Sequence, residues 1–360
     1  MKNLSRDFWR GRRVFVTGHT GFKGSWLVTW LVDMGADVVG YSLEPNTEPS
    51  IFQAANLASG MNSIIGDIRN AGDLAGALET HQPEVVFHLA AQPLVRYSYG
   101  HPVETYDTNV MGTLHLMEAV RAAGSVRAAV MVTSDKCYEN NEWVWGYRES
   151  DPMGGRDPYS SSKGCAELLI KSYRDSYFSG PGEDKEWTAI ASVRSGNVIG
   201  GGDWSEDRIV PDAVKAFVAG EPLEVRSPGA IRPWQHVLEP LFGYILLAEQ
   251  LVNEGAGYTG AWNFGPNPDD AKSVSSIVDT LVRFWGEGAG WRSVSDQRLH
   301  EANYLKLECA KARDILHWQP RWNLEEAIEK TVQWYKAFYA GEDMLSLMKT
   351  QIGQYESAHG

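Results

Sequence analysis

Short apolar runs alternate with longer segments of helical periodicity along the first half of this 360-residue chain. Five runs have the length and β-branched content of buried strands, at residues 13–17, 37–41, 64–67, 84–89 and 127–134. Helices are expected between them, over residues 25–32, 73–80 and 105–123. Strands spaced by helices are joined by right-handed crossovers, so the pattern predicts an α/β fold with a doubly wound parallel sheet.

The pattern changes after residue 195, where glycines, prolines and tryptophans crowd together and the apolar runs become brief. The chain is also longer than the roughly 250–300 residues at which one core usually stops growing. We therefore expect a sheet domain over residues 1–195 and mainly a smaller lobe over residues 196–360. The lobe is expected to be interleaved with the last strands of the sheet.

Composition narrows the class of partner. The chain carries 46 acidic against 33 basic residues, a formal net charge of −13. Such a surface repels a phosphate backbone, so we expect no nucleic-acid partner. Cys137, Cys165 and Cys309 are too few and too scattered for a disulfide framework or a metal site. The start has no apolar signal core and no stretch approaches about 18 apolar residues, so we expect a cytoplasmic protein with no membrane partner.

A glycine-rich turn, GHTGFKG at residues 18–24, directly follows the first predicted strand and opens a helix. Glycines there permit a tight turn and a close approach of the backbone to a pyrophosphate, which then lies at the helix N-terminus. The spacing is GxxGxxG, and a turn without a ligand is the alternative. The sequence therefore predicts a dinucleotide site in a Rossmann-like domain, with contacts from Gly18, Thr20, Gly21, Phe22, Lys23 and Gly24.

The end of the second strand bears on the choice of cofactor. A carboxylate usually stands there to bind the adenosine ribose, but this chain has Ser42, with an acid only at Glu44. No arginine stands nearby to bind a 2′-phosphate, which favours NAD over NADP. Asp67 and Ile68, after the third strand, are expected at the adenine; Asp67 capping a turn is the alternative.

Three further features indicate a family. Tyr159 and Lys163 stand four residues apart on one helix face, and Ser134, Asp135 and Lys136 follow the fifth strand. Together with HLAA at 88–91 and NVMGT at 109–113, these motifs resemble the extended short-chain dehydrogenase/reductases that act on sugar nucleotides. The resemblance covers nearly the whole chain. It implies bound NAD, with further cofactor contacts from Leu89, Ala90, Ala91, Thr108, Thr133, Tyr159 and Lys163.

Four longer runs are similar to the CDP-D-glucose 4,6-dehydratase subfamily, at residues 17–26, 133–138, 196–204 and 232–237. The resemblance implies conversion of CDP-D-glucose to CDP-4-dehydro-6-deoxy-D-glucose plus water. Relatives that handle dTDP- or GDP-sugars usually carry Asp-Glu where this chain has Asp135-Lys136. The resemblance also implies a homodimer or higher homo-oligomer.

Oxidation of a sugar at C4 requires a base for the O4 proton, and free tyrosine, with a pKa near 10, is a poor base at neutral pH. Lys163 and the positive nicotinamide are expected to favour the phenolate of Tyr159 and to lower its pKa. Ser134 would hydrogen-bond the same O4 oxygen. An exposed helix pair without a catalytic role is the alternative for Tyr159 and Lys163.

Elimination from the 4-ketone requires a base at C5 and an acid at O6. Asp135 is the expected acid, provided that burial keeps it protonated; a surface carboxylate would be inert. Lys136 has two alternatives, which the sequence leaves open. It either loses its proton and acts as the C5 base, or stays charged and stabilises the enolate.

The substrate's diphosphate needs cations, and Arg232 is the best candidate, with Asn197 and Arg208 nearby in the motif order. Gln92 and Trp234 complete the expected substrate contacts. A solvated charge is the alternative for Arg208. No cluster of His, Cys and Asp has metal-ligand spacing, so no metal is expected.

Two other functions compete with dehydration. A sugar-nucleotide 4-epimerase would use the same tyrosine and lysine, but it needs no acid at O6. A non-catalytic NAD-binding regulator would have no reason to keep Ser134, Tyr159 and Lys163 together. The family resemblance implies a dimer interface on the helices at 105–123 and 159–178, where apolar residues recur at helical spacing: Val110, Leu114, Met117, Val120, Leu168, Leu169, Tyr173 and Tyr177. Packing of these faces on the sheet of the same subunit is the alternative, and some of the residues must pack there.

Overall fold

A parallel sheet lies at the centre of the computed structural model, which describes residues 2–180, 187–294 and 305–358. Within these residues the sheet has seven strands in the order β11-β6-β5-β4-β1-β2-β3. Every neighbouring pair in it is parallel. The predicted doubly wound sheet is therefore confirmed. Its strands are β1 (Arg13–Thr17), β2 (Asp37–Ser42), β3 (Asn62–Ile65), β4 (Val85–His88), β5 (Ala128–Val132), β6 (Ala189–Arg194) and β11 (Gly260–Asn263).

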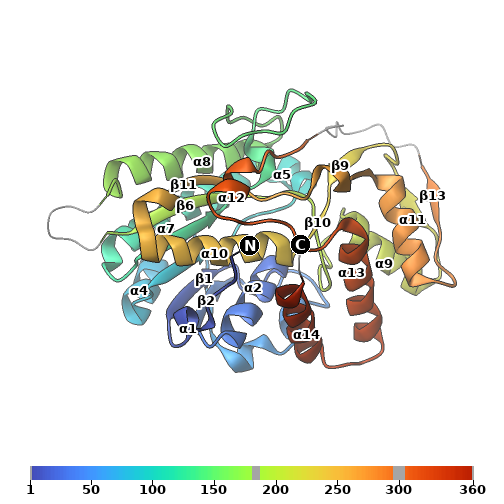
Figure 1. Cartoon of the computed structure of the whole chain (residues 1–360), viewed down its shortest axis with the longest axis horizontal. Coiled ribbons are helices and arrows are strands. Elements are labelled where there is room, and N and C mark those ends of the chain that lie inside the picture. Colours follow the sequence, from blue (N-terminus) through green and yellow to red (C-terminus); the bar gives the residue numbers. More distant parts are fainter. Residues whose placement is uncertain (1, 181–186, 295–304, 359–360) are drawn as a thin grey trace.

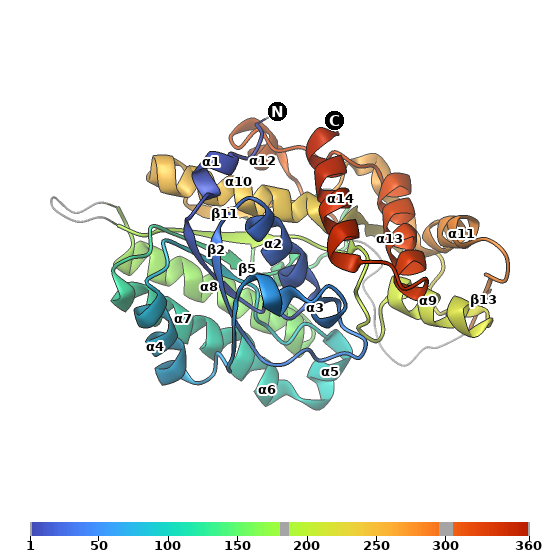
Figure 2. The same ribbon diagram turned by 90° about the horizontal axis from the view of Figure 1, so that it is seen from below.

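Helices cover both faces of this sheet (Figures 1 and 2). One face carries α2 (Phe22–Asp33) and α10 (Leu238–Glu254), and the other carries α4 (Ala71–His81), α7 (Gly112–Ala123) and α8 (Pro158–Tyr177). The helix predicted over 105–123 is one continuous run of α6, a π-helical turn and α7. Shorter or peripheral helices are α1 (Arg6–Trp9), α3 (Ile51–Ala54), α5 (Val95–Gly100), α6 (Pro102–Tyr106), α12 (Ala310–Asp314) and α14 (Met344–Ser357).

Alternation along the strands builds the two apolar cores. In β1, Val14 and Val16 pack beneath α2 and α10, whereas Phe15 between them packs on the opposite side with α4 and α7. Successive side chains of a strand point to opposite faces, so a strand buried on both faces must be apolar throughout. This explains why the first strands are continuous apolar runs in the sequence and could be predicted from it.

The segment after β6 leaves the sheet and forms small two-stranded pairs, and β11 returns to the sheet edge. Around these pairs lie α9 (Ile209–Ala219), α11 (Val274–Trp285) and α13 (Leu324–Tyr339), on the right in Figure 1. The short strands are β7 (Val198–Ile199), β8 (Leu223–Val225), β9 (Ile231–Pro233), β10 (Gln235–His236), β12 (Ala271–Ser273) and β13 (Trp291–Ser293). Among the described residues, no helix has both the length and the apolar character to cross a membrane.

Candidate active site

A cavity of about 1370 Å³ opens where β1, β4, β5 and β6 end. Its walls come from the turns that follow these strands on one side and from residues 197–234 on the other. Open α/β sheets place their ligands at this edge. Of the residues predicted for the site, it is lined by Phe22, Lys23, Thr133, Ser134, Asp135, Lys136, Tyr159, Asn197, Arg208, Arg232 and Trp234.

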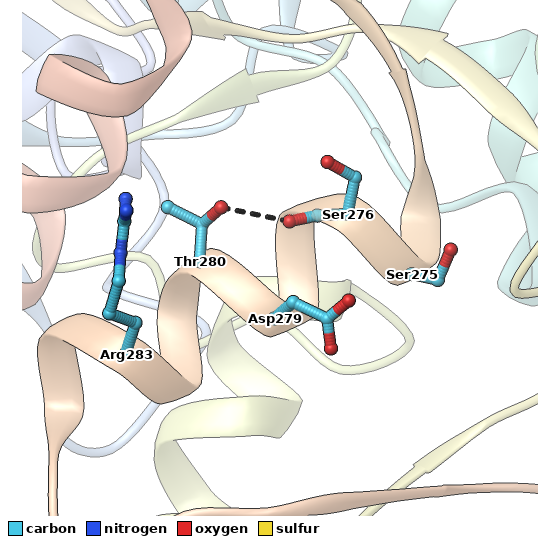
Figure 3. Close-up of a pocket in the computed structure, with 5 residues that line it drawn as sticks. All are labelled: Ser275, Ser276, Asp279, Thr280 and Arg283. Atoms are coloured by element: carbon cyan, nitrogen blue, oxygen red, sulfur yellow. Dashed lines mark hydrogen bonds between the residues drawn. The ribbon is translucent and has the colours of Figure 1, made fainter.

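A smaller hollow of about 300 Å³ lies on the surface of α11 (Figure 3). Its lining residues all come from this one helix, and the Thr280 hydroxyl donates to the Ser276 carbonyl within it. A single helix face brings no groups together from different elements. We therefore place the chemistry in the large cleft.

The end of β5 forms the catalytic wall. Ser134 caps a short 3₁₀ turn, Asp135–Cys137, because its Oγ accepts from the Lys136 backbone N–H at 3.2 Å. The same hydroxyl donates to Asp135 Oδ1 at 3.1 Å and is hydrogen-bonded to the phenol of Tyr159. Three of the predicted groups are thus joined through one serine.

Tyr159 and Lys163 lie one turn apart in α8, and both are buried. Burial raises the pKa of Tyr159 to about 12, although the Ser134 hydrogen bond and the Arg208 charge oppose the rise. Without cofactor, burial thus outweighs these two groups, and the lowered pKa expected with bound nicotinamide stays a prediction. Removing the phenol proton requires further positive charge beside it, which a bound nicotinamide would supply.

Lys163 is held under the strand end, where its Nζ donates to the Val132 carbonyl at 3.5 Å. Burial lowers the pKa of Lys163 to about 8, while the negative charge of Glu167 raises it. Glu167 itself forms a buried pair with Arg194, 2.7 Å apart. Sequence reasoning missed this pair, because its members lie on different elements and carry no motif.

Asp135 is buried against the chain that follows β6. A Cβ atom at Gly196 would lie 1.7 Å from Asp135 Oδ2, so only glycine leaves room for the carboxylate. Lys136 is exposed at the cleft, with its Nζ 6.0 Å from the centre of the Tyr159 ring. Asp135 and Lys136 therefore line the cleft from adjacent positions, with Asp135 buried in its wall and Lys136 exposed at its surface.

The side chain of Lys23 leaves the glycine turn and enters the same cleft. Its Nζ donates to Ser195 Oγ at 3.0 Å, and that hydroxyl is 2.7 Å from the Tyr244 hydroxyl. Burial and the positive charge of Arg208 lower the pKa of Lys23 to about 8. A lysine predicted at the cofactor thus stands beside the catalytic groups as well.

The glycine turn has the shape that a dinucleotide requires. Gly18 has φ +77°, and a Cβ there would lie 2.6 Å from the Ala90 backbone nitrogen. A Cβ at Gly24 would lie 2.0 Å from the Gly18 carbonyl oxygen, so helix and turn touch. A Cβ at Gly21 would lie 3.4 Å from the Gly18 carbonyl oxygen, an ordinary contact, and Gly21 is the N-cap of α2 without a capping side chain. Free N–H groups at a helix N-terminus suit a pyrophosphate, so these residues fit NAD.

The end of β2, where the adenosine ribose is expected, lacks the carboxylate that usually stands there in dinucleotide-binding domains. Ser42 Oγ lies 2.9 Å from Thr20 Oγ1, which also donates to the Leu43 carbonyl at 2.8 Å. Asp67 is held by Arg69, with 2.6 Å between Oδ2 and Nη2, and this pair lowers the pKa of Asp67. No carboxylate stands at the end of β2 itself, as the sequence indicated.

The substitution Ser42→Asp should therefore tighten NAD binding. It places a carboxylate at the strand end, where the ribose hydroxyls are expected, and two charge-assisted hydrogen bonds would form. We expect Kd for NAD to fall about 10-fold, measured by calorimetry on protein freed of nucleotide. Wild-type protein that keeps stoichiometric NAD through long dialysis would contradict the argument.

The predicted substrate residues differ in their surroundings. Arg208 is joined to the buried Asp203 at 2.7 Å, and Asn197 adopts φ +43° at the cleft wall. Trp234 is buried with one edge on the cleft. The amide of Gln92 is used in internal hydrogen bonds, because Nε2 donates to the Leu94 carbonyl and to the hydroxyl of Thr105 in α6.

The remaining predicted cofactor residues follow β3 and β4 or precede α7. Ile68 is buried beneath Gly112, and Thr108 lies in the π-helical turn before α7. Leu89 and Ala91 are partly buried just beyond β4. Within the described ranges, no group of His, Cys, Asp and Glu residues is arranged to hold a metal ion.

Comparison with known proteins agrees with this geometry. Residues 15–252 match the sequence model of the GDP-mannose 4,6-dehydratase family, and the chain belongs to that family. It is 54% identical to the CDP-glucose 4,6-dehydratase of Salmonella typhimurium over 355 residues, 99% of both chains. It is 31% identical to the UDP-glucose 4-epimerase of Mycolicibacterium smegmatis, over 90% of this chain and 98% of the other.

Among solved structures, the chain is similar to MoeE5 in complex with UDP-glucuronic acid and NAD. The TM-score is 0.74 and the sequence identity 26%, over 90% of this chain and 99% of MoeE5. The family and the fold that the motifs indicated are both confirmed.

Proposed function

We propose that this protein is an NAD-dependent hydro-lyase that converts CDP-D-glucose to CDP-4-dehydro-6-deoxy-D-glucose and water. The observation that carries the proposal is the 54% identity to a CDP-glucose 4,6-dehydratase across 99% of both chains. The site supports it, because Ser134, Asp135, Lys136 and Tyr159 line one cleft. The glycine turn at residues 18–24 would hold NAD, which would supply a hydride acceptor for C4 of the sugar and a hydride donor for C6.

In the first half of the reaction, side chains of the cleft remove the O4 proton of the sugar. Tyr159 is the base that takes this proton, and Ser134, already hydrogen-bonded to the phenol, orients the O4 oxygen. Lys163 places positive charge below the phenol. The buried Glu167–Arg194 pair stabilises the floor of the site, with Thr133 donating to Glu167.

In the second half a proton leaves C5 and water leaves C6. Asp135 gives its proton to O6, so that the C6 hydroxyl leaves as water, and Lys136 acts at C5, either as base or as the charge that stabilises the enolate. A proton returns to C5 when the hydride reaches C6, which completes the 6-deoxy product. The diphosphate of the substrate lies against the 196–360 lobe, where Arg208, Arg232, Asn197 and Trp234 line the cleft.

Incubation with CDP-glucose, followed by mass spectrometry, tests the proposal. Dehydration gives a product lighter by one water, with the cofactor unchanged in amount. An isomer of unchanged mass would instead establish a 4-epimerase. Binding of NAD without any change in the sugar nucleotide would indicate a regulator and contradict the proposal.

The protein is also expected to form a dimer through α7 and α8. Met117 and Val120 pack against the sheet of their own subunit, so these two residues of the predicted interface are unavailable. Leu168 and Tyr177 are 59% and 58% exposed, and Val103 on neighbouring α6 is 82% exposed. An apolar surface of this kind is typical of a subunit contact.

Light scattering at micromolar concentration should therefore give the mass of a dimer or a higher oligomer. Leu168→Glu should shift the mass toward the monomer, because it buries a charge in the contact. Val218→Glu, on the exposed side of α9, is the matched control. A monomeric wild-type protein would refute the interface.

A further inference from the structure

The side chain of Lys23 spans the interval between the glycine turn and the catalytic wall. Lys23 is the second residue of α2, directly after the turn whose shape fits a pyrophosphate. Its Nζ donates to Ser195 Oγ at 3.0 Å, in the segment that follows β6. The Ser195 carbonyl in turn accepts from the Asp135 N–H at 3.3 Å. The ammonium therefore lies next to the backbone that carries the catalytic groups.

Bound NAD must cross the same interval. Its pyrophosphate is expected at the glycine turn, and its nicotinamide ring must meet C4 of the sugar beside Tyr159 and Ser134, which are hydrogen-bonded to each other. The nicotinamide half of the cofactor therefore lies between the turn and the end of β5. Lys23 begins at one end of this path and reaches Ser195 at the other, and both residues line the cleft. Its ammonium is thus a neighbour of the nicotinamide ring.

The positive charge of Lys23 is poorly compensated by the protein. Its position in the first turn of α2 puts a cation where the helix dipole favours an anion. Among the described residues, no carboxylate forms an ion pair with its Nζ. Burial, and after it the positive charge of Arg208, lower the pKa of Lys23 to about 8, and Asp135 and Asp203 oppose this only in part. The group is therefore still mostly protonated at pH 7, and its charge acts on whatever is bound in the cleft.

A cation beside the nicotinamide acts differently on the two oxidation states of the cofactor. The oxidised ring is positive and the reduced ring is neutral, so a neighbouring ammonium repels only the oxidised ring. In the oxidation step the C4–H bond of the sugar breaks, the hydride passes to the ring, and the O4 proton passes to Tyr159. The positive charge of the ring disappears in this step. A fixed ammonium therefore favours the step, at the expense of affinity for NAD.

We propose that Lys23 raises the reduction potential of the bound cofactor, because its ammonium destabilises NAD relative to NADH and so favours hydride transfer from C4 of the sugar. The use of this potential in dehydration rests on the proposed function, whereas the effect on the two cofactor forms requires only that the cofactor binds. The missing carboxylate at Ser42 concerns the adenosine end, which is the same in both forms. Lys23 acts at the other end, where the forms differ.

The substitution Lys23→Met tests the proposal, because it removes the charge and keeps most of the length of the side chain. Kd for NAD should fall about 10-fold, with little change in Kd for NADH, because only the oxidised ring is repelled. Calorimetry with each form, on protein freed of nucleotide, gives the ratio of the two Kd values. A ratio 10-fold smaller corresponds to a reduction potential about 30 mV more negative for this two-electron couple.

Lys23→Arg is the matched control, because it keeps the positive charge. Its ratio of Kd values should stay within about 2-fold of the wild-type ratio. Ser42→Asp is a second control, which should tighten NAD and NADH by the same factor and leave the ratio unchanged. Thermal melting checks that each variant folds.

Three results would overturn the inference. Equal weakening of NAD and NADH by Lys23→Met would make Lys23 a contact of the pyrophosphate, and two unchanged Kd values would place its ammonium away from the cofactor. The same fall in the ratio with Lys23→Arg would show an effect of side-chain shape rather than of charge. Since binding needs no turnover, a smaller ratio in Lys23→Met alone would stand even if CDP-glucose were not dehydrated.

Discussion

Replacement of Tyr159 by phenylalanine should abolish every step of the reaction, including the first. The phenol is the group that takes the O4 proton, and the ring alone cannot accept it. Loss of a positioned proton-transfer group typically lowers a rate about 10²–10⁴-fold. Product formation should fall at least that far, and no reduced cofactor should be detected at 340 nm after CDP-glucose is added.

The structure adds a pH dependence to this prediction. Because burial raises the pKa of Tyr159, the wild-type phenol is mostly protonated at neutral pH unless bound cofactor lowers that pKa. The rate of the oxidation step should therefore increase with pH until the phenol has lost its proton. Tyr339→Phe, on the exposed surface of α13, serves as control. Persistent cofactor reduction in Tyr159→Phe would remove Tyr159 from the role of base.

The sheet and the glycine turn could be predicted because their signals are local. A strand buried on both faces is a continuous apolar run, and Gly18, Gly21 and Gly24 stand within one turn. Tyr159 and Lys163 are likewise four residues apart on one helix. In each case the residues that act together are close in sequence, so spacing alone places them in space.

The missed parts of the site depend on the topology. Glu167 meets Arg194 because β6 runs beside α8, and Lys23 meets Ser195 because β1 and β6 end at the same edge. Asp207 meets Arg96 across the cleft. Such pairs form because elements distant in the sequence pack together, so no sequence motif predicts them.

Burial also altered the chemistry that residue types suggested. The sequence predicts that Lys163 and the nicotinamide lower the pKa of Tyr159, but in the protein without cofactor desolvation has the largest effect on the pKa values of both Tyr159 and Lys163. The further positive charge that is needed to remove the proton of the Tyr159 phenol must then come from the bound cofactor. This couples cofactor binding to catalysis, since NAD provides the field as well as the hydride acceptor.

Lys136→Met should separate the two halves of the reaction. Oxidation at C4 uses Tyr159, Ser134 and Lys163, and it leaves the exposed Lys136 ammonium uninvolved. The variant should therefore reduce its cofactor on adding CDP-glucose, and then stall before water is lost. Product formation should fall about 10²–10⁴-fold, roughly 3–5 kcal/mol of barrier. Lys349→Met, which removes the same charge from α14, should behave like the wild type.

Exchange of the C5 hydrogen with deuterium from solvent decides what Lys136 does. If its amine is the C5 base, exchange should vanish in Lys136→Met while reduced cofactor still accumulates. If its charge only stabilises the enolate, another group removes the proton, and exchange should persist at a slower rate. The position of Nζ, 6.0 Å from the centre of the Tyr159 ring, puts the ammonium close to the reacting sugar in either role. Near-normal dehydration by Lys136→Met would exclude both roles, and the elimination would then depend on Asp135 and its buried neighbours.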